Sequence, residues 1–119
     1  MILTLDILNE LQRNMYGLEC CYKLLEDLEN YTESRCTERS RQKAIYTTKK
    51  RINYLEEHIQ QVLDAVDQIH DDEIRTICYD HFVLNWTWQA TAESMFTSSA
   101  KIRNTMNEYF NKLHPDVQN

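Results

Sequence analysis

With 119 residues, the chain holds enough material for one domain, or for one small domain with a helical extension. Hydrophobic residues make up 42% and charged residues 27%, which excludes a disordered chain, and the single Gly and single Pro exclude a fold of many β-hairpins. The formal net charge of −6 argues against nucleic-acid binding by the whole surface, although a local site stays open.

The expected compartment follows from the apolar runs and the cysteines. No apolar run approaches about 18 residues, so we expect no transmembrane helix. The acid at Asp6 and the lack of a basic start argue against a signal peptide. Four cysteines have neither CxxC spacing nor the density of a disulfide framework: Cys20, Cys21, Cys36 and Cys78. We expect reduced thiols and a cytoplasmic protein.

The first predicted helix covers residues 4–31. Its apolar residues recur at alternating spacings of three and four, which marks one stripe of a helix. The stripe consists of Leu8, Leu11, Met15, Leu18, Tyr22 and Leu25, widened by Ile7, Leu24 and Leu28. Gly17 is its weak point, since a Gly inside a helix costs about 1 kcal/mol relative to Ala. Residues 30–37 are rich in capping residues and are expected to connect two helices.

The second predicted helix covers residues 39–70 and has the clearest pattern in the chain. A heptad seam with one polar member runs through Ile45, Thr48, Ile52, Leu55, Ile59, Val62, Val66 and Ile69. At 1.5 Å per residue this helix would extend roughly 45–50 Å, too far for a small globule to cover. The seam therefore predicts a coiled-coil-like antiparallel hairpin with the first helix, and pairing with a second copy in a homodimer or higher homo-oligomer.

Charges are unevenly distributed along these two helices. Residues 1–34 hold seven acidic and two basic residues, residues 35–51 one acidic and seven basic, and residues 52–73 seven acidic and no basic. Two interpretations of the basic segment stay open. It is a phosphate-binding patch, or it pairs with the acids at the end of the first helix. We favour the ion pairs, because basic runs beside acidic runs usually form solvated faces.

Three shorter helices are predicted after residue 70, over residues 71–84, 86–96 and 99–114. The expected caps and stop are Asp71 or Asp72, Ser98 or Ser99, and Pro115. The expected inward residues are Ile74, Ile77, Cys78, His81 and Phe82, then Trp88, Ala92 and Met95, then Ile102, Met106, Tyr109, Phe110 and Leu113. The predicted fold is all-α, with a hairpin in residues 1–70 and a three-helix unit in residues 71–119.

The last two of these helices have the pattern of a helix-turn-helix, in which the last helix presents a polar face. Ala92 stands where the two helices cross closely and where a larger side chain would push them apart. Met95 closes the core from the first of these helices, and Ile102 fills the space beneath the second. The pattern predicts a recognition helix at the end of the chain.

Residues 72–113 resemble region four of bacterial sigma factors, and more closely small phage regulators that join such a region to a helical hairpin. In the family pattern S/T-W-x-x-I-A-x-x-L-x-x-S-x-x-x-V, the matching residues are Thr87, Trp88, Ala92, Met95, Ser98 and Ile102. The layout is also similar to phage late-transcription activators of the ArpU type. The resemblance implies a DNA-binding protein of a bacterial host cell that controls phage late genes or acts near the DNA-packaging genes.

Three positions depart from that pattern. Thr91 stands where the family prefers Ile, Thr105 where an aliphatic residue is common, and Phe96 where a turn glycine is usual. A bulky residue at Phe96 is strained if the turn needs a positive φ. We therefore expect the turn to have a different shape.

The outward residues of the predicted recognition helix follow from its inward ones. They are Ser99, Ala100, Arg103, Asn104 and Asn107. Arg103 suits guanine O6 and N7, and Asn104 or Asn107 suits adenine N6 and N7, each bidentate contact contributing about 1–3 kcal/mol of base discrimination. Lys101 and Lys112 are expected to contact phosphates. The alternative is an ordinary solvated helix face.

Other chemistry is not indicated by the residues. Cys78-x-x-His81 has the spacing of half a metal site, but no second ligand pair stands nearby, so a buried Cys and a hydrogen-bonded His are expected. Trp86 and Trp88 are a residue type that stacks on bases, yet at helical spacings such residues usually belong to the core, with Trp86 partly exposed. The paired acids lack an apolar pocket to shift a pKa. We expect no enzyme, no metal and no cofactor.

The sequence thus predicts a regulator that binds double-stranded DNA sequence-specifically through residues 71–119. Two alternatives stay open. One is a DNA-packaging factor that resembles a small terminase subunit and assembles into a ring. The other is a protein-interaction module that binds a transcription component such as RNA polymerase, which the acidic balance and Phe96 favour.

Overall fold

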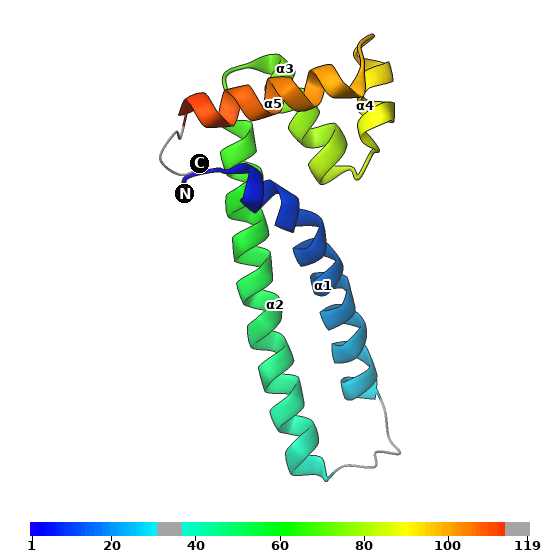
Figure 1. Cartoon of the computed structure of the whole chain (residues 1–119). Helices are drawn as coiled ribbons and strands as arrows, with labels where there is room; N and C mark the ends of the chain where they lie inside the picture. Colours follow the sequence, from blue (N-terminus) through cyan, green and yellow to red (C-terminus); the bar gives the residue numbers. More distant parts are fainter. Residues whose placement is uncertain (31–36, 114–119) are drawn as a thin grey trace. The chain divides into compact units, whose positions relative to one another are not determined.

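The structure, a computed structural model, describes residues 1–30 and 37–113. Its helices are α1 (Leu5–Asn30), α2 (Glu38–Asp67), α3 (Asp72–Ile77), α4 (Trp88–Ser94) and α5 (Ser99–Leu113), with a π-helical segment, η1 (Cys78–Val83), directly after α3 (Figure 1). The described residues contain no strand, which confirms the all-α prediction. Residues 31–36 of the predicted connection and the predicted stop at Pro115 lie outside the described residues.

Contacts divide the chain into two compact units. Unit 1 comprises residues 1–12 and 61–119, and unit 2 comprises residues 13–60. Each unit thus takes one part of α1 and one part of α2. The predicted boundary after residue 70 divides a dimerisation hairpin from a DNA-binding part. These contact-based units do not test that division, so it stays a prediction.

In unit 2, the contacts between α1 and α2 follow the two helices in opposite order. A Cβ added at Gly17 would lie 3.9 Å from the Leu55 Cδ1 atom. Nearer the end of α1, the Lys49 Nζ atom lies 4.0 Å from a carboxylate oxygen of Glu29. The Arg41 guanidinium donates a hydrogen bond to the carbonyl of Leu28. Residues late in α1 therefore contact residues early in α2.

The predicted seam of α2 is confirmed by burial. In unit 2 its buried members are Thr48, Ile52, Leu55 and Ile59, with Ile45 half-buried, and in unit 1 they are Val62, Val66 and Ile69. The one polar member, Thr48, is only 7% exposed. An unbroken three-four spacing keeps one stripe of the helix inward over this whole length, because the heptad repeat is close to the helical period.

The predicted stripe of α1 is wrong at two residues of its second half, although Leu18, Leu25 and Leu28 are half-buried. Tyr22 and Leu24 were expected inward, yet they are 46% and 50% exposed, whereas Cys21 is 7% exposed. Cys21 comes one position before Tyr22, so the inward side of α1 in unit 2 does not follow the apolar stripe. The Tyr22 hydroxyl instead donates a hydrogen bond to the Glu56 carboxylate at the surface of unit 2.

Unit 1 has the larger core. Its almost fully buried side chains come from all the helical segments of the unit: Leu8, Leu11, Val62, Val66, Ile74, Ile77, Cys78, Thr91, Ile102, Met106 and Phe110. Of the residues predicted to face inward on the last helix, Leu113 is an exception, since it is 51% exposed. Trp88 and Met95 are half-buried rather than buried.

The helix predicted over residues 71–84 is α-helical in its first half and π-helical in its second half. Asp71 caps α3 as predicted, because its carboxylate accepts a hydrogen bond of 3.1 Å from the backbone N–H of Ile74. After Ile77 the chain widens into η1, which ends with a bond of 2.8 Å from the Leu84 N–H to the Tyr79 carbonyl. Asn85 then adopts a φ of 64° and reverses the chain. Residue types that favour α-helix give no signal of such a wide turn.

The next helix is shorter than its predicted range of residues 86–96. Thr87 caps it, since its hydroxyl accepts a hydrogen bond of 3.0 Å from the backbone N–H of Ala90. The helix therefore begins at Trp88, and Trp86, predicted to start it, lies outside it. The partial exposure predicted for Trp86 is confirmed, at 41% of its surface. A threonine with an extended backbone is a preferred N-cap, which explains this later start.

Candidate nucleic-acid interface

The candidate site lies on α5, whose buried side packs against other helices of unit 1. Helix α5 packs against α3 and α4, and its buried residues are Ile102, Met106 and Phe110. Ala92 of α4 is 2% exposed. A small side chain at this position permits close approach of the two helices, so the packing role predicted for Ala92 and Ile102 is consistent with their burial.

The turn between α4 and α5 closes with two backbone hydrogen bonds. The N–H of Phe96 donates to the Glu93 carbonyl at 3.2 Å, and the N–H of Thr97 donates to the Ala92 carbonyl at 3.0 Å. This is the Schellman arrangement, in which the residue after the helix adopts the left-handed conformation. Phe96 does so with a φ of 57°. The expected change of turn shape is therefore wrong, and the chain accepts a strained residue instead.

Two other departures from the family pattern have local explanations. Thr91 is fully buried, and its hydroxyl donates a hydrogen bond of 2.9 Å to the Thr87 carbonyl of the same helix. The Thr105 hydroxyl donates a bond of 2.9 Å to the Lys101 carbonyl. Both hydroxyls are satisfied within their own helix, so neither needs a polar partner in the core.

The start of α5 is capped by Ser98, one of the two predicted residues. Its hydroxyl accepts a hydrogen bond of 3.2 Å from the Lys101 N–H. The predicted base-reading residues follow from there: Ala100, Arg103, Asn104 and Asn107 are exposed, and Ser99 is half-buried. The predicted phosphate contacts, Lys101 and Lys112, are exposed as well.

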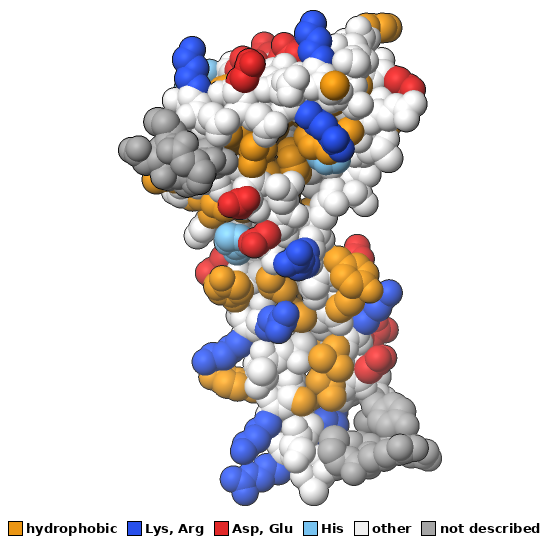
Figure 2. Space-filling view, in the orientation of Figure 1, with side chains coloured by type: hydrophobic (Ala, Val, Ile, Leu, Met, Phe, Trp, Pro, Cys, Tyr) orange, Lys and Arg blue, Asp and Glu red, His pale blue; other side chains and the backbone are white. Residues whose placement is uncertain are grey.

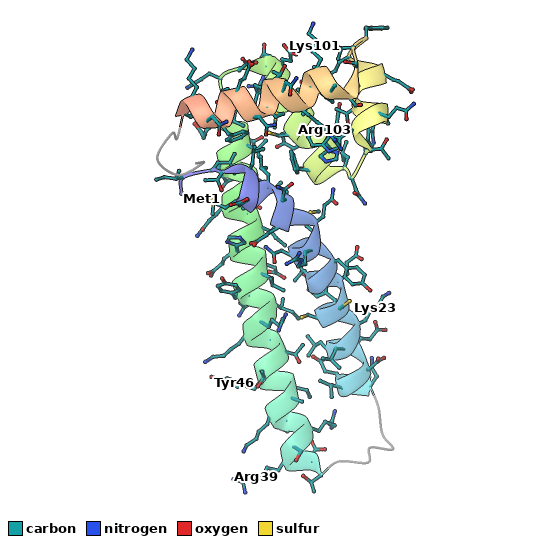
Figure 3. All side chains as sticks on the ribbon, viewed as in Figure 1. Met1, Lys23, Arg39, Tyr46, Lys101 and Arg103 are labelled. Atoms are coloured by element: carbon teal, nitrogen blue, oxygen red, sulfur yellow. The ribbon has the colours of Figure 1, made fainter. Side chains whose placement is uncertain are left out.

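These residues do not share one surface of α5. At 100° per residue, Ser99, Arg103 and Asn107 form one flank, and Lys101 and Lys112 lie on the other. Ala100 and Asn104 point away from the core between the two flanks. Figure 3 shows Lys101 and Arg103 on different sides of α5. A single groove of DNA can contact Ala100 and Asn104 together with one flank. It cannot contact both flanks in the same way, because they face in different directions.

Arg103 lies against an aromatic cluster. Its guanidinium carbon is 5.5 Å from the centre of the Trp88 ring, and the His81 ring stacks on the same indole with centroids 3.6 Å apart. Together with Asn107 and residues of α1, Arg103 lines a small cleft of about 180 Å³. Cation–π attraction restricts the guanidinium, so this side chain is partly positioned before any ligand binds. The sequence pattern gave no signal of this contact.

His81 and Cys78 take the roles predicted for them. The His81 Nδ1 atom lies 2.7 Å from the Trp86 carbonyl, so that nitrogen carries the proton. Burial lowers the pKa of His81; the Trp86 carbonyl raises it and the charge of Arg103 lowers it. Burial alone raises the pKa of the Cys78 thiol to about 12. Both side chains are therefore uncharged at neutral pH.

The two units differ in charge. Unit 1 holds eleven acidic and four basic residues, whereas unit 2 holds eight acidic and nine basic residues. Only three of the four bases of unit 1 lie on α5: Lys101, Arg103 and Lys112. The fourth, Arg75, pairs with Asp72 on α3. Unit 1 therefore offers few cations for a phosphate backbone.

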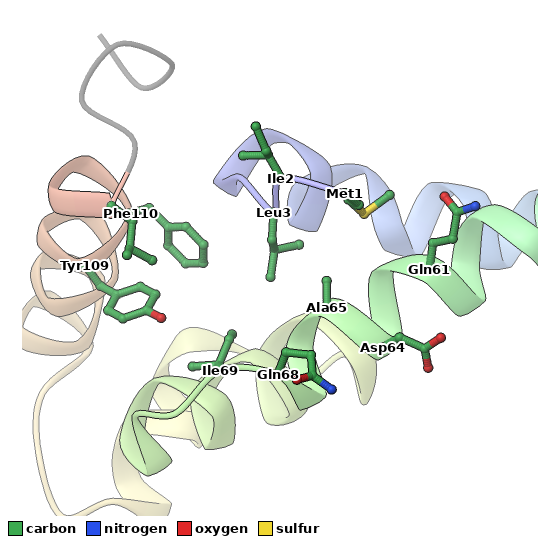
Figure 4. A pocket seen from close by; sticks show the side chains of 11 residues that line it. Met1, Ile2, Leu3, Gln61, Asp64, Ala65, Gln68, Ile69, Tyr109 and Phe110 are labelled. Carbon is green, nitrogen blue, oxygen red and sulfur yellow. The ribbon is translucent and has the colours of Figure 1, made fainter.

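Unit 1 also contains an open apolar groove of about 720 Å³ (Figure 4). Its walls are the start of the chain at Met1–Leu3, the end of α2 and the end of α5, where Tyr109, Phe110 and Leu113 contribute. Burial raises the pKa of Tyr109, as do the nearby Asp71 and Cys78. The groove explains why Leu113 is half exposed: it forms a rim rather than part of the core.

The described residues form neither a metal site nor a membrane-spanning helix. Across residues 1–30 and 37–113, no group of His, Cys, Asp and Glu is arranged to hold a metal ion. None of the helices described is both long and apolar enough to cross a membrane.

Comparisons of the chain with protein families, with characterised proteins and with solved structures found no match.

Proposed function

We propose that the protein binds duplex DNA sequence-specifically through α5, which α4 and the turn at Met95–Ser98 present as a helix-turn-helix. The observation that carries the proposal is the combination of a close α4–α5 packing at Ala92, a Schellman turn and an α5 whose outward line is polar. This is the arrangement in which the second helix enters the major groove with its first residues at the base edges. The resemblance to sigma region four and to phage late regulators adds a role in transcription control.

Five exposed residues of α5 contact DNA in this proposal. Arg103 contacts guanine bidentately from its place beside Trp88. Asn104 and Asn107 contact adenine. Lys101 and Lys112 contact phosphates on the other flank of α5 and set the position of the helix.

The proposal includes an antiparallel hairpin of α1 and α2 that pairs with a second copy. In unit 2, α1 exposes Tyr16, Cys20 and Leu24, which recur every four residues. Tyr16 is 69% and Leu24 50% exposed, a stripe that a second hairpin would cover. Two copies would present two α5 helices to half-sites about one helical turn, roughly 34 Å, apart or a multiple of it.

The experiment is selection of bound sequences from random duplex DNA, followed by affinity measurement on the selected site. The double variant Arg103→Ala/Asn104→Ala should lose specific binding while its circular dichroism stays helical. Arg13→Ala/Asn14→Ala on α1 is the matched control, because it removes the same two residue types outside α5. Unchanged specificity in the α5 variant would refute the recognition-helix assignment.

A protein-interaction module is the second candidate function. The excess of acidic residues in unit 1 favours it, because DNA repels acidic residues. The 97% exposure of Phe96 also favours it, because an apolar pocket of a partner would cover this side chain. No selected DNA sequence, together with capture of purified bacterial RNA polymerase that Phe96→Ala abolishes, would decide for this candidate.

The DNA-packaging alternative predicts the same α5 chemistry in a ring-shaped assembly. Light scattering separates it from the regulator, because a stable complex of eight or nine copies excludes a simple dimer.

A further inference from the structure

One side of α2 in unit 2 combines exposed cations with exposed aromatic rings. We define the basic–aromatic face as Arg39, Lys43, Tyr46, Lys50 and Tyr54. Their spacings of four, three, four and four place them on one side of the helix, opposite the buried residues Thr48 and Ile52. Figure 3 shows Arg39 and Tyr46 on this outer side, and Figure 2 shows Lys and Arg gathered along the same part of α2 beside hydrophobic side chains.

The cations of this face are not neutralised by the described residues. The sequence led us to favour ion pairs between the basic segment and the acids of α1, and Lys49 does approach such an acid, at 4.0 Å from Glu29. Arg41 pairs with Glu38 on α2 itself, and this bond lowers the pKa of Glu38. In residues 1–30 and 37–113, no ion pair involves the three cations of the face. The favoured interpretation is therefore wrong for them.

The aromatic rings of the face are equally open. Tyr46 is 62% and Tyr54 68% exposed. The Lys50 Nζ atom lies 5.0 Å from the centre of the Tyr46 ring, and the Tyr54 ring stacks parallel to His58. These contacts lie along the helix and leave both rings largely exposed. Like charges four residues apart, such as Arg39 and Lys43, repel and destabilise the free helix.

We infer that the basic–aromatic face binds the phosphate backbone of a nucleic acid. An anion would relieve the repulsion between the cations, and tyrosine hydroxyls are common donors to phosphate oxygens. From Arg39 to Lys50 the face extends roughly 16 Å at 1.5 Å per residue, which exceeds the width of about 12 Å of a DNA major groove. It is thus long enough to contact phosphates on both edges of that groove. The inference depends on unit 2 alone and does not require α5 to read bases.

The test compares two variants with equal loss of charge. Lys43→Gln/Lys50→Gln removes two cations of the face, and Arg13→Gln/Lys23→Gln removes two exposed cations of α1 in the same unit. Binding of the full-length proteins to a labelled random-sequence duplex is followed by fluorescence anisotropy between 25 and 200 mM KCl. A matching single strand serves as a second probe of the same backbone chemistry.

The face variant should bind the duplex at least about 10-fold more weakly at low salt, and the slope of log K against log salt should become shallower by about 2. The α1 variant should retain nearly all of the affinity and slope. Tyr46→Phe/Tyr54→Phe, which keeps the rings, should weaken binding a few-fold through loss of the hydroxyl donors. Equal losses in the face and α1 variants, or no loss in the face variant, would overturn the inference.

Two further outcomes would assign the face to another partner and overturn the inference. Loss of self-association with unchanged DNA affinity would assign it to the acidic residues of a second copy. Loss of binding to phosphatidylserine vesicles alone would assign it to a membrane surface.

The outcomes also separate this inference from the proposed function. The α5 variant Arg103→Ala/Asn104→Ala should lose sequence preference and keep most of its low-salt binding. The face variant should lose low-salt binding uniformly across sequences and keep the preference.

Discussion

Unit 1 and unit 2 are both helical, but they differ in the burial of their side chains and in their charge. Unit 1 buries eleven large side chains almost completely and carries an excess of seven acids. The described residues of unit 2 include no side chain in that class, and unit 2 carries an excess of one base. A well-packed unit can hold α5 in one position, but its charge opposes phosphate binding. A weakly packed unit with open cations can supply affinity without precise geometry. This comparison agrees with our proposals, in which unit 1 reads the DNA sequence and unit 2 supplies affinity for the phosphate backbone.

The largest effect should come from the core of unit 1. Ile102→Ala should lower the free energy of unfolding by about 2–5 kcal/mol, because Ile102 is fully buried beneath α5. Both tryptophans, Trp86 and Trp88, belong to unit 1, so tryptophan fluorescence during urea unfolding reports on it. Leu25→Ala, at a half-buried position of unit 2, should cost less. Equal costs at the two positions would contradict the difference in packing.

A smaller and opposite effect is expected at the turn of unit 1. Phe96→Gly should stabilise the protein by about 0.5–1 kcal/mol, because Gly adopts the φ of 57° without a Cβ clash and Phe96 makes little packing contact. Phe96→Ala keeps the Cβ and serves as the control, with little change expected. The midpoint of thermal unfolding measures both. A destabilising glycine would show that the strain at this turn is absent.

Unit 2 offers the reverse substitution. Gly17→Ala should stabilise the protein by up to about 1 kcal/mol, because Gly17 lies inside α1 and the added Cβ would make an ordinary contact with Leu55 at 3.9 Å. Far-UV circular dichroism during unfolding follows the helix. A loss of stability would mean that α1 and α2 approach each other more closely in unit 2 than this distance indicates.

The smallest effect concerns pH and is confined to unit 1. Burial holds the pKa of His81 below its ordinary value of 6.5, so the folded state resists a proton that the unfolded state accepts. The stability that neutral His81 contributes is complete above pH 6.5 and falls as the pH decreases from there toward the lower folded pKa. Unfolding midpoints at pH 7.5 and 5.5 should differ less in His81→Phe than in the wild type. An identical difference in both proteins would remove His81 as the cause.

Much of the helical architecture was accessible from residue order. The seam from Ile45 to Ile69, the cap at Asp71 and the small residue at Ala92 each depend on chemistry within one helix or at one helix end. Such local rules operate before tertiary contacts form. The choice of Cys21 over Tyr22 on α1 did not follow, because it depends on which side of α1 its neighbour in unit 2 covers.

The candidate sites were predicted less completely. Exposure of Arg103 and Asn104 followed from the inward positions of Ile102 and Met106, since a helix has a fixed period. The contact of Arg103 with Trp88 joins residues on different helices, and no spacing in the chain announces it. Whether Lys43 and Lys50 form ion pairs likewise depends on which carboxylates of α1 come close to α2.

The sequence by itself determined that this protein is helical, that α2 carries one continuous apolar seam and that α5 has one polar side. These properties follow from periodicity, capping and the scarcity of Gly and Pro, which act over a few neighbouring residues. Tertiary structure alone decided that the turn at Phe96 keeps a positive φ and that η1 follows α3. It also decided that Arg39, Lys43 and Lys50 form no ion pair within residues 1–30 and 37–113. The pairing of these cations depends on residues that are distant in the chain, whose geometry no local pattern contains.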